Sequence, residues 1–402
     1  MTNFHQGRAW VELDRAALRH NVEYLQALLP PGCALMPVVK ANAYGHGAVL
    51  IAGELNALGI SAFCTASVFE GIELRRNGVT GEILILGYTH PRHVPLLKQY
   101  RLTQTVLDYA CARELSACAQ DIDVHLKIDT GMHRAGERFE NLEELRQIFC
   151  CPHLRVTGAY THLYADDLTL PASRAAALEQ SGIFYRTTAQ LKALGCQIPK
   201  VHIMASGGLL RCPEIGGDYA RVGIALYGQL STRAEWDKTG HELRPVLSLK
   251  ARIVLIKSLS LGEGAGYEHQ FIATRPTKLA VAAIGYADGL PYSLSNGAGA
   301  ALLHGRAAPV AGRVCMDQTL LDVTDVPEAA PGDTAVFIGR SGDKEITACG
   351  VAEQAGTIAN EILSRLGPRL ERRMVCRVGR TSSRLCCIVG KTGHTIFHHE
   401  GG

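Results

Sequence analysis

Eight short apolar runs, each of strand length, alternate with helical patterns in the first part of this chain. The runs cover residues 35–39, 62–65, 83–86, 103–107, 124–128, 156–163, 201–205 and 222–227. Strands that alternate with helices favour a parallel sheet, because a parallel connection needs a crossover segment. Eight such units predict a TIM-type (β/α)8 barrel rather than an open doubly wound sheet.

The pattern changes near Pro245, and a second, mostly β domain is predicted beyond it. Apolar and polar residues alternate from Leu247 to Leu255, which is the period of a half-buried strand. Further strands are expected at 279–284, 300–303, 310–314, 319–323 and 335–338, with one helix at 351–366. We therefore expect a barrel domain over residues 8–243 and a strand-rich domain over 244–402, with residues 1–7 packing against the second.

The composition is that of an ordinary globular protein and argues against several classes of partner. The 402 residues are 47% hydrophobic and 20% charged, and 41 basic residues against 38 acidic ones leave a net charge of +3. This balance does not favour nucleic acid or an acidic membrane surface. Because the sequence has no apolar run of membrane-spanning length and no signal peptide, a cytoplasmic location is expected.

The cysteines indicate a reducing environment. There are 13 of them, an odd number without the spacing of a disulfide framework or a zinc site. Reduced thiols and no bound metal are therefore expected.

The first apolar run ends at Lys40, and a turn that contains Tyr44, Gly45 and Gly47 follows it. A lysine at a strand end leaves a hydrophobic wall and enters a site, where partial burial lowers its pKa. A neutral amine is the form that attacks a carbonyl carbon to make a Schiff base. A surface lysine is the ordinary alternative, but the neighbouring hydroxyl and glycines favour a site for a phosphorylated cofactor.

Two later segments predict a phosphate site at the same mouth of the barrel. Ser206-Gly207-Gly208 follows the seventh run, and Gly223 lies in the eighth. Barrels commonly hold phosphate at these loops, where glycine-rich turns present backbone amides to anions. With Lys40, these segments predict pyridoxal 5'-phosphate, which carries an aldehyde and a phosphate. His162, at another strand end, is equally compatible with a core histidine.

Motifs in order along nearly the whole chain resemble the two-domain alanine racemases. The matching stretches are Val38–Gly47, Lys127–Arg134, Tyr160–His162, Ala205–Gly207, Arg221–Gly228, Gly266–Tyr267, Ile284–Gly289 and Gly312–Gln318. The first and last are highly specific. The resemblance implies a pyridoxal-phosphate enzyme that interconverts L- and D-alanine, and a homodimer whose active site is shared between subunits.

The resemblance assigns two catalytic bases. Lys40 would bind the cofactor and act on one face of the substrate, and the partner subunit's Tyr267 would act on the other. Two opposed bases suit a racemisation, because a proton leaves one face and another returns to the opposite face. A tyrosine has a reference pKa of about 10. It would need cationic neighbours, for which His162 and Arg221 are candidates.

Phosphate-binding residues are implied as well. Tyr44, Ser206, Gly223 and Ile224 match the positions that hold the cofactor phosphate in the family. Lys127 matches a lysine that is carbamylated in some family members and that orients a neighbouring arginine.

Residues around the cofactor ring and the substrate complete the implied site. Arg221 would face the pyridine nitrogen, and His162 would lie beside the ring. Arg134 would lie near the phenolic oxygen and the substrate carboxylate. Met316 and Asp317 would line the site from the partner subunit.

Three positions depart from the usual family pattern. Asn360 stands where alanine racemases usually have a tyrosine that contacts the phosphate and narrows the substrate pocket, so the resemblance makes it a substrate-binding residue. The serine racemase domains of vancomycin-resistance systems share this asparagine. Tyr292 replaces a common arginine at the substrate entrance, and His133 replaces a common glycine. Those serine racemases carry an amino-terminal membrane domain that this sequence lacks, so a free-standing relative or a catalytic part is expected.

The expected function is racemisation of alanine, with serine as a second or preferred substrate, supplying D-amino acids for peptidoglycan. One alternative is an enzyme that acts primarily on serine. Another is a barrel-type amino-acid decarboxylase, which would need a cysteine motif that Cys315 does not display. The third is a non-catalytic cofactor-binding protein, but those are usually single barrels.

Overall fold

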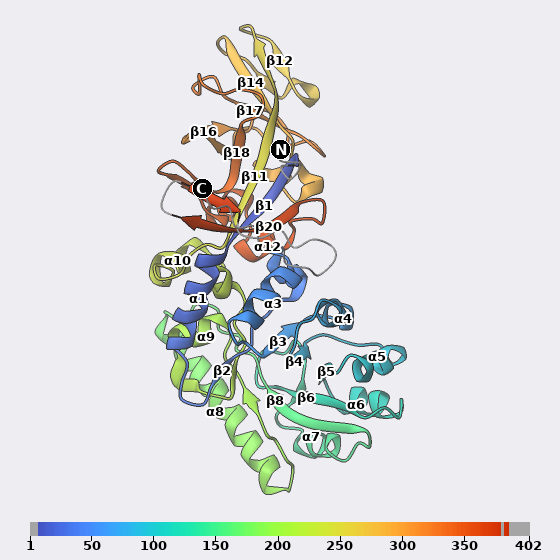
Figure 1. The fold of residues 1–402 in the computed structure, drawn as a ribbon. Coiled ribbons are helices and arrows are strands. Elements are labelled where there is room, and N and C mark those ends of the chain that lie inside the picture. The colour runs from blue at the N-terminus through green and yellow to red at the C-terminus, as the bar shows by residue number, and fades with distance from the viewer. Residues whose placement is uncertain (1–6, 379–381, 386–402) are drawn as a thin grey trace, which may run out of the picture. The chain divides into compact units, whose positions relative to one another are not determined.

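A computed structural model describes residues 7–378 and 382–385 (Figure 1). The chain divides into two compact units. The barrel unit comprises 22–43 and 48–226, and the strand-rich unit comprises the chain up to Asn21, the segment Tyr44–Gly47 and the chain from Tyr227 onward. The domain boundary at 243/244 stays a prediction, and the packing of residues 1–6 lies outside the described residues.

Eight strands form the ring of the barrel unit. They are β2 (Ala34–Leu35), β3 (Ala62–Thr65), β4 (Glu82–Ile85), β5 (Thr103–Val106), β6 (Ile122–Asp129), β8 (Leu154–Tyr160), β9 (Val201–His202) and β10 (Tyr219–Ala220). Neighbours from β3 to β9 pair in parallel, and β10 pairs in parallel with β2. A parallel bridge from Val38 to Cys64 joins the β2 segment to β3. Hydrogen bonds from Asp218 N to Val201 O (2.7 Å) and from Arg221 N to Met204 O (2.9 Å) complete the ring. The predicted barrel is confirmed.

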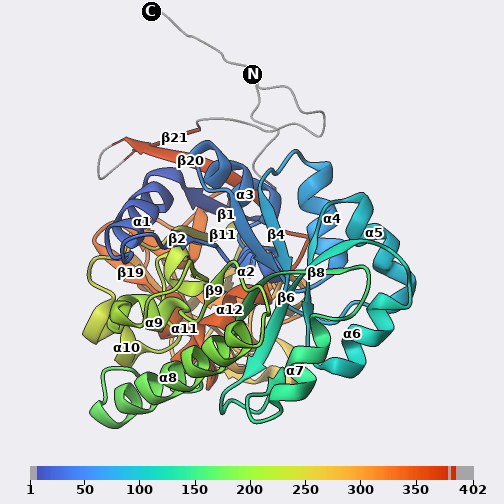
Figure 2. The same cartoon turned by 90° about the horizontal axis from the view of Figure 1, so that it is seen from below.

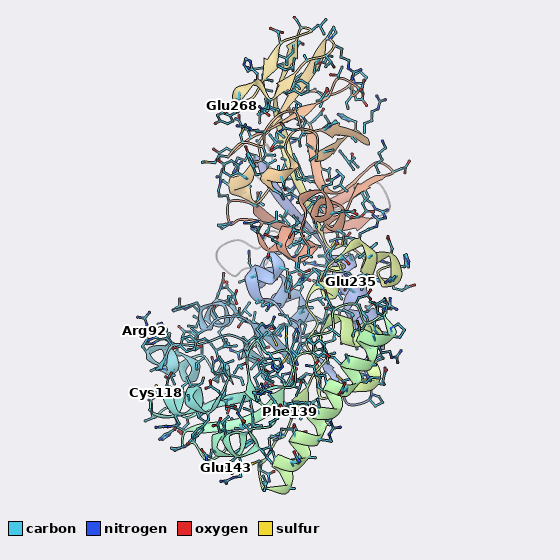
Figure 3. The ribbon with its side chains drawn as sticks, turned by 180° about the vertical axis from the view of Figure 1, so that it is seen from behind. Arg92, Cys118, Phe139, Glu143, Glu235 and Glu268 are labelled. Atoms are coloured by element: carbon cyan, nitrogen blue, oxygen red, sulfur yellow. The ribbon has the colours of Figure 1, made fainter. Side chains whose placement is uncertain are left out.

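Helices connect these strands and cover the outside of the ring, as the view in Figure 2 shows. They are α3 (Ala48–Ala57), α4 (Val68–Arg76), α5 (Val94–Gln99), α6 (Tyr109–Ser116), α7 (Leu142–Ile148), α8 (Pro171–Ala193) and α9 (Ser206–Arg211). Their outer faces are charged: Glu143 on α7, labelled in Figure 3, pairs with Arg146 at 2.7 Å, and both side chains are exposed. Their inner faces bury apolar residues such as Leu145 and Ile148 against the strands.

The last predicted strand of the barrel is wrong in its position. The eighth strand is β10, and the run 222–227 contains instead the 3-10 helix η3 (Ile224–Tyr227). The amide of Leu226 donates to Gly223 O at 3.0 Å, which closes a helical turn. The run is apolar because all of it is buried, and a buried run of this length does not distinguish strand from helix.

The strand-rich unit is built around one large sheet and the long strand β11 (Leu247–Leu259). Its other strands are β1 (Ala9–Asp14), β14 (Thr277–Ala282), β15 (Ala300–Leu303), β16 (Arg306–Pro309), β17 (Thr319–Asp322), β18 (Thr334–Ser341), β19 (Lys344–Ile346), β20 (Glu371–Val378) and β21 (Ser382–Leu385). A separate hairpin joins β12 (Gly264–Ala265) to β13 (Phe271–Ile272). Strand β1 lies between β11 and β20, so the first described strand of the chain belongs to this sheet.

Several details of the strand-rich unit differ from expectation. The helix predicted at 351–366 is two helices, α11 (Ala348–Ala355) and α12 (Ala359–Ser364), because Gly356 ends the first with a φ of 72°. The strand predicted at 310–314 is instead β16, four residues earlier. Cys376 is disulfide-bonded, contrary to the expectation of reduced thiols, whereas the ten other described cysteines, such as Cys64 and Cys315, are free.

Two further α-helices are α1 (Arg15–Ala27) and α10 (Arg233–Thr239). Among the described residues, no helix combines the length and the apolarity needed to cross a membrane.

Candidate functional site

Lys40 opens the unusual turn α2 (Lys40–Tyr44). The three residues after the lysine, Ala41, Asn42 and Ala43, have φ angles of 51° to 54°. These values belong to the left-handed helical region, which disfavours residues other than glycine by about 1–2 kcal/mol each. Strain of this kind persists only where the surroundings enforce it, and it is common at functional sites.

Two polar side chains enforce the turn. Glu70, on α4, accepts the amide of Ala41 at 2.8 Å through one carboxylate oxygen and the amide of Ala66 at 2.7 Å through the other. Asn42 accepts the amide of Ala48 at 2.8 Å, at the start of α3. The turn is therefore tied to the helices on both sides, which fixes the direction in which Lys40 leaves the strand.

The amine of Lys40 lies in a positively charged region. Burial lowers the pKa of Lys40, and the charge of Arg134 lowers it further, while Cys64 and Glu70 oppose the change. Among the described residues, no hydrogen bond or ion pair engages its Nζ atom. The neutral amine predicted from the sequence is thus favoured by burial and by the nearest cation.

Lys127 and Arg221 both lie near the buried aromatic ring of Tyr160. The Nζ atom of Lys127 lies 4.8 Å from the centre of the Tyr160 ring, and the guanidinium carbon of Arg221 lies 4.9 Å from it. Burial lowers the pKa of Lys127 to about 7, with help from the charges of Arg221 and Arg134. Both side chains are buried. Four basic residues, Lys40, Lys127, Arg134 and Arg221, therefore act on this region, and among the described residues no hydrogen bond or ion pair joins a carboxylate to any of them.

His162 contacts this group as a neutral ring. Its Nδ1 atom lies 3.4 Å from Arg221, and burial first and then the charges of Arg221 and Lys127 lower the pKa of His162 to about 2. This lowered pKa disfavours the cationic form of His162, which was one of the two cationic neighbours expected for Tyr267. Arginine is effectively always protonated, so Arg221 remains the cationic candidate.

The loop that carries Arg134 explains the unusual histidine before it. His133 has a φ of 53°, a conformation that favours the glycine common at this position. Its Nδ1 atom lies 3.0 Å from an Asp129 oxygen, and the other Asp129 oxygen accepts the amides of Gly131 and His133. These bonds to Asp129 hold the histidine in a strained conformation, and the loop ends in Arg134 at the carboxyl end of β6.

Ser206 and Gly223 lie together, as the sequence predicts. The Oγ atom of Ser206 accepts the amides of Gly223 at 3.1 Å and Ala225 at 3.3 Å. These two amides, one residue apart, point at one atom, which resembles the concave arrangement of backbone amides that binds anions. Ile224 lies between the two amides and begins η3.

These donors fit pyridoxal phosphate. The group has a phosphate and an ionisable ring oxygen, and the basic side chains of Lys127, Arg134 and Arg221 together with two convergent amides provide the positive charge and donors that such an anion needs. A primary amine with a lowered pKa provides the attachment point.

The other predicted site residues belong to the strand-rich unit. Tyr44 lies 5.3 Å from Tyr227, measured between ring centres. Tyr267 is 66% exposed and follows Gly266, whose φ is 74°. Met316 is exposed, and the carboxylate of Asp317 pairs with Arg369 at 2.6 Å.

Asn360 lies on α12 with its amide oxygen buried. That oxygen has no hydrogen-bond partner among the described residues. A buried acceptor without a donor is costly, by roughly 1–3 kcal/mol. Asn360 is therefore suited to accept a hydrogen bond from a bound molecule.

The sequence analysis missed the residues that support the site from behind. Glu70 gave no signal, because a glutamate three residues into a helix is ordinary. His125 and His202 each interrupt an apolar strand segment, Val-His-Leu and Val-His-Ile, and that pattern could have found them. A histidine inside a buried strand needs a polar partner, so each pattern indicates an interior network.

A closed parallel barrel that gathers a lysine, further basic side chains and convergent amides at the carboxyl ends of its strands has the architecture of a barrel enzyme. Residues 13–231 match the family described as alanine racemase, N-terminal domain, and residues 246–374 match alanine racemase, C-terminal domain. The chain belongs to the alanine racemase family.

Individual relatives agree with this assignment. An alanine racemase of Nostoc is 39% identical over 91% of this chain and 95% of its own length. A serine/alanine racemase of Enterococcus gallinarum is 37% identical over 91% of this chain but 51% of its own length. The chain thus spans about half the length of this and other enterococcal relatives. The crystal structure of alanine racemase from Bacillus anthracis with bound L-Ala-P superposes with a TM-score of 0.87, at 30% identity over 96% of this chain and 99% of that one.

Proposed function

We propose that this protein is a pyridoxal-phosphate-dependent amino-acid racemase that acts on alanine and also on serine. The observation that carries the proposal is the Lys40 amine, which has a lowered pKa and lies among Lys127, Arg134 and Arg221 at the barrel mouth. When bound, pyridoxal phosphate supplies an electron sink that makes the α-proton of an amino acid removable.

The predicted cofactor-binding residues have the following roles in this proposal. Ser206, Gly223 and Ile224 would hold the phosphate, together with Tyr44, and the Lys40 amine would be the attachment point for the aldehyde. Arg221 donates to the ring nitrogen and stays protonated, because a guanidinium does not release its proton near neutral pH. A ring nitrogen that gains no proton is a weaker electron sink, which suppresses side reactions such as transamination.

Two groups move the proton. Lys40 Nζ takes it from one face of the α-carbon, and the hydroxyl of Tyr267 acts on the opposite face. Arg134 binds the substrate carboxylate, and the neutral ring of His162 packs beside the cofactor. Because Tyr267 is exposed in the strand-rich unit, it can be contributed by a partner subunit, as the resemblance implies for a homodimer.

The buried oxygen of Asn360 supports serine as a substrate. The resemblance assigns Asn360 to the substrate pocket with Met316 and Asp317, and a serine hydroxyl would donate to that oxygen. We also propose a cytoplasmic enzyme that supplies D-amino acids for peptidoglycan. The decarboxylase alternative gains no support, because burial raises the pKa of the Cys315 thiol and so disfavours a nucleophilic thiolate.

The test is exchange of the α-proton in heavy water, started from each enantiomer of alanine. We expect Lys40→Ala to abolish exchange and to remove the visible absorption of the bound cofactor. We expect Tyr267→Phe to retain the absorption and to lose exchange from one enantiomer selectively. Lys98→Ala, which alters an exposed lysine on α5, is the matched control. Full turnover by Lys40→Ala would refute the proposal.

A further inference from the structure

A chain of buried polar side chains crosses the interior of the barrel. It begins at Arg221, whose Nη1 atom donates to His202 Nδ1 at 2.6 Å. Nε2 of His202 lies 2.9 Å from Nδ1 of His125. Nε2 of His125 lies 3.0 Å from Glu82 Oε1, close enough for a strong electrostatic contact although it does not point straight at that oxygen. Glu82 is the first residue of β4, so the chain runs from the mouth of the barrel to the opposite face.

The donors and acceptors in this series of side chains are ordered in one direction. Arginine can only donate hydrogen bonds, so His202 must present an unprotonated Nδ1 atom and carry its proton on Nε2. Burial, followed by the charge of Arg221, holds the pKa of His202 well below its usual value, so the ring is neutral. Its Nε2 proton then faces Nδ1 of His125, which places the proton of a neutral His125 ring on Nε2, toward Glu82. Arg221 at one end of the series and Glu82 at the other therefore favour the same tautomers of His202 and His125.

The acidic end of the chain is held from two sides. Oε2 of Glu82 accepts from Lys200 Nζ at 2.9 Å and from the Tyr219 hydroxyl at 2.9 Å. Burial opposes ionisation, but the contacts with His125 and Lys200 lower the pKa of Glu82 to about 2. The chain therefore ends in a fixed carboxylate, which can only accept.

Close packing and further hydrogen bonds restrict the positions of these side chains. A methyl group at Gly158 would lie 2.8 Å from His125 Nε2, which is closer than carbon and nitrogen can approach. The rings of His202 and Tyr160 stack at 4.9 Å with 6° between their planes. The other terminal nitrogen of Arg221 donates to the carbonyl oxygens of Thr161 at 2.7 Å and Ile203 at 3.0 Å.

We infer that Glu82, separated from Arg221 by the rings of His202 and His125, is a positioning residue for it. Glu82 fixes the tautomer of His125, His125 fixes that of His202, and His202 holds the guanidinium in the one orientation that leaves its remaining protons toward the barrel mouth. A purely structural role at the amino-terminal face of a barrel is the alternative, since that face generally serves stability.

The first measurement is independent of catalysis. Histidine-labelled protein gives the protonation of each ring nitrogen from its 15N chemical shifts. We expect His125 and His202 to be neutral Nε2–H tautomers, and Glu82→Gln to shift His125 toward a mixture, because an amide can donate as well as accept. Asp123→Asn is the matched control, since Asp123 lies at the same face of the barrel but pairs with Arg155, which is not part of the series from Arg221 to Glu82.

The second measurement rests on the proposed function. We expect Glu82→Gln to lower kcat for alanine racemisation by about two- to thirtyfold, the range for residues in coupled networks, with KM unchanged. Gly158→Ala, which displaces His125 but leaves the contacts of Glu82 with Lys200 and Tyr219, should give the same two changes if Glu82→Gln fails to fold.

Loss of thermal stability in both variants, with unchanged imidazole shifts and unchanged kcat, would overturn the inference. If the shifts respond as expected but the wild-type protein racemises no amino acid, the proposed function is refuted. The coupling of Glu82 to His125 and His202 is then still supported.

Discussion

The lowered pKa of Lys127 makes the stability of the fold depend on pH. In the folded protein its pKa is lowered to about 7 by burial and by Arg221 and Arg134, against an ordinary value of 10.5. A lysine whose pKa falls on folding disfavours the fold wherever it must still be charged. That cost is fully present below about pH 7 and disappears as the pH rises toward the unfolded value.

We therefore expect Lys127→Met to remove part of the pH dependence of stability. Between about pH 7 and pH 10 the free energy of unfolding of the wild type should rise relative to the variant by up to about 1.4 kcal/mol per pH unit. Urea unfolding of both proteins across this range measures the difference. A constant difference would contradict a lowered pKa of Lys127 in the folded protein.

Asn360 carries a prediction about substrate choice. A net hydrogen bond contributes roughly 1 kcal/mol, so Asn360→Tyr should lower the serine-to-alanine ratio of kcat/KM about fivefold. Asn360→Leu keeps the size and removes the amide. If the leucine variant retains the ratio and the tyrosine variant changes it, pocket size rather than hydrogen bonding selects the substrate.

Among the elements, the turn α2 depends on a helix that follows it in the chain. Glu70 both caps α4 and accepts the amide of Ala41, whereas Ser67 only caps α4 through the amide of Glu70. Glu70→Ala should lower the free energy of unfolding by about 2 kcal/mol, and Ser67→Ala by about 1 kcal/mol. Urea titrations of the two variants compare them. Equal losses would show that Glu70 acts on the helix alone.

The elements also show how far sequence patterns reach. Strands β3 and β4 and their helices follow from apolar period and breakers, because both their burial and their length are local properties. Lys40, Ser206 and Gly223 were found because a barrel brings the carboxyl ends of its strands to one mouth. The run 222–227 was assigned wrongly because burial alone does not select strand or helix.

Long-range contacts set the limit of such prediction. The positive φ angles of α2 depend on two side chains that accept amides further along the chain. Glu70 accepts the amide of Ala41, and Asn42 accepts the amide of Ala48. The lowered pKa of His162 depends on burial and then on charges from distant parts of the sequence, Arg221 and Lys127 first among them. Neither is encoded in a local period.

For the whole molecule, the distribution of the site residues over two compact units matters. Lys40 belongs to the barrel unit and Tyr267 to the strand-rich unit. If each active site combines Lys40 of one subunit with the other base from its partner, a hybrid of Lys40→Ala and Tyr267→Phe subunits contains one intact site and one site that lacks both bases.

We expect each parent variant to lack racemase activity and the purified hybrid dimer to recover about half of the wild-type rate, since one of two equivalent sites is restored. Differently tagged subunits, co-expressed and purified through both tags, supply the hybrid. A hybrid as inactive as its parents would place both bases within one subunit.

The backbone of α2 is the mirror image of an ordinary helical turn at Ala41 and Ala43, with φ and ψ near +50°. An amino acid of inverted chirality prefers these angles, whereas an L-residue is disfavoured there by about 1–2 kcal/mol. Semisynthesis with D-alanine at Ala41 or Ala43 should therefore stabilise the turn, although the same replacement would break a right-handed helix. The segment that presents Lys40 would accommodate, in its own backbone, the enantiomer that the proposed reaction produces.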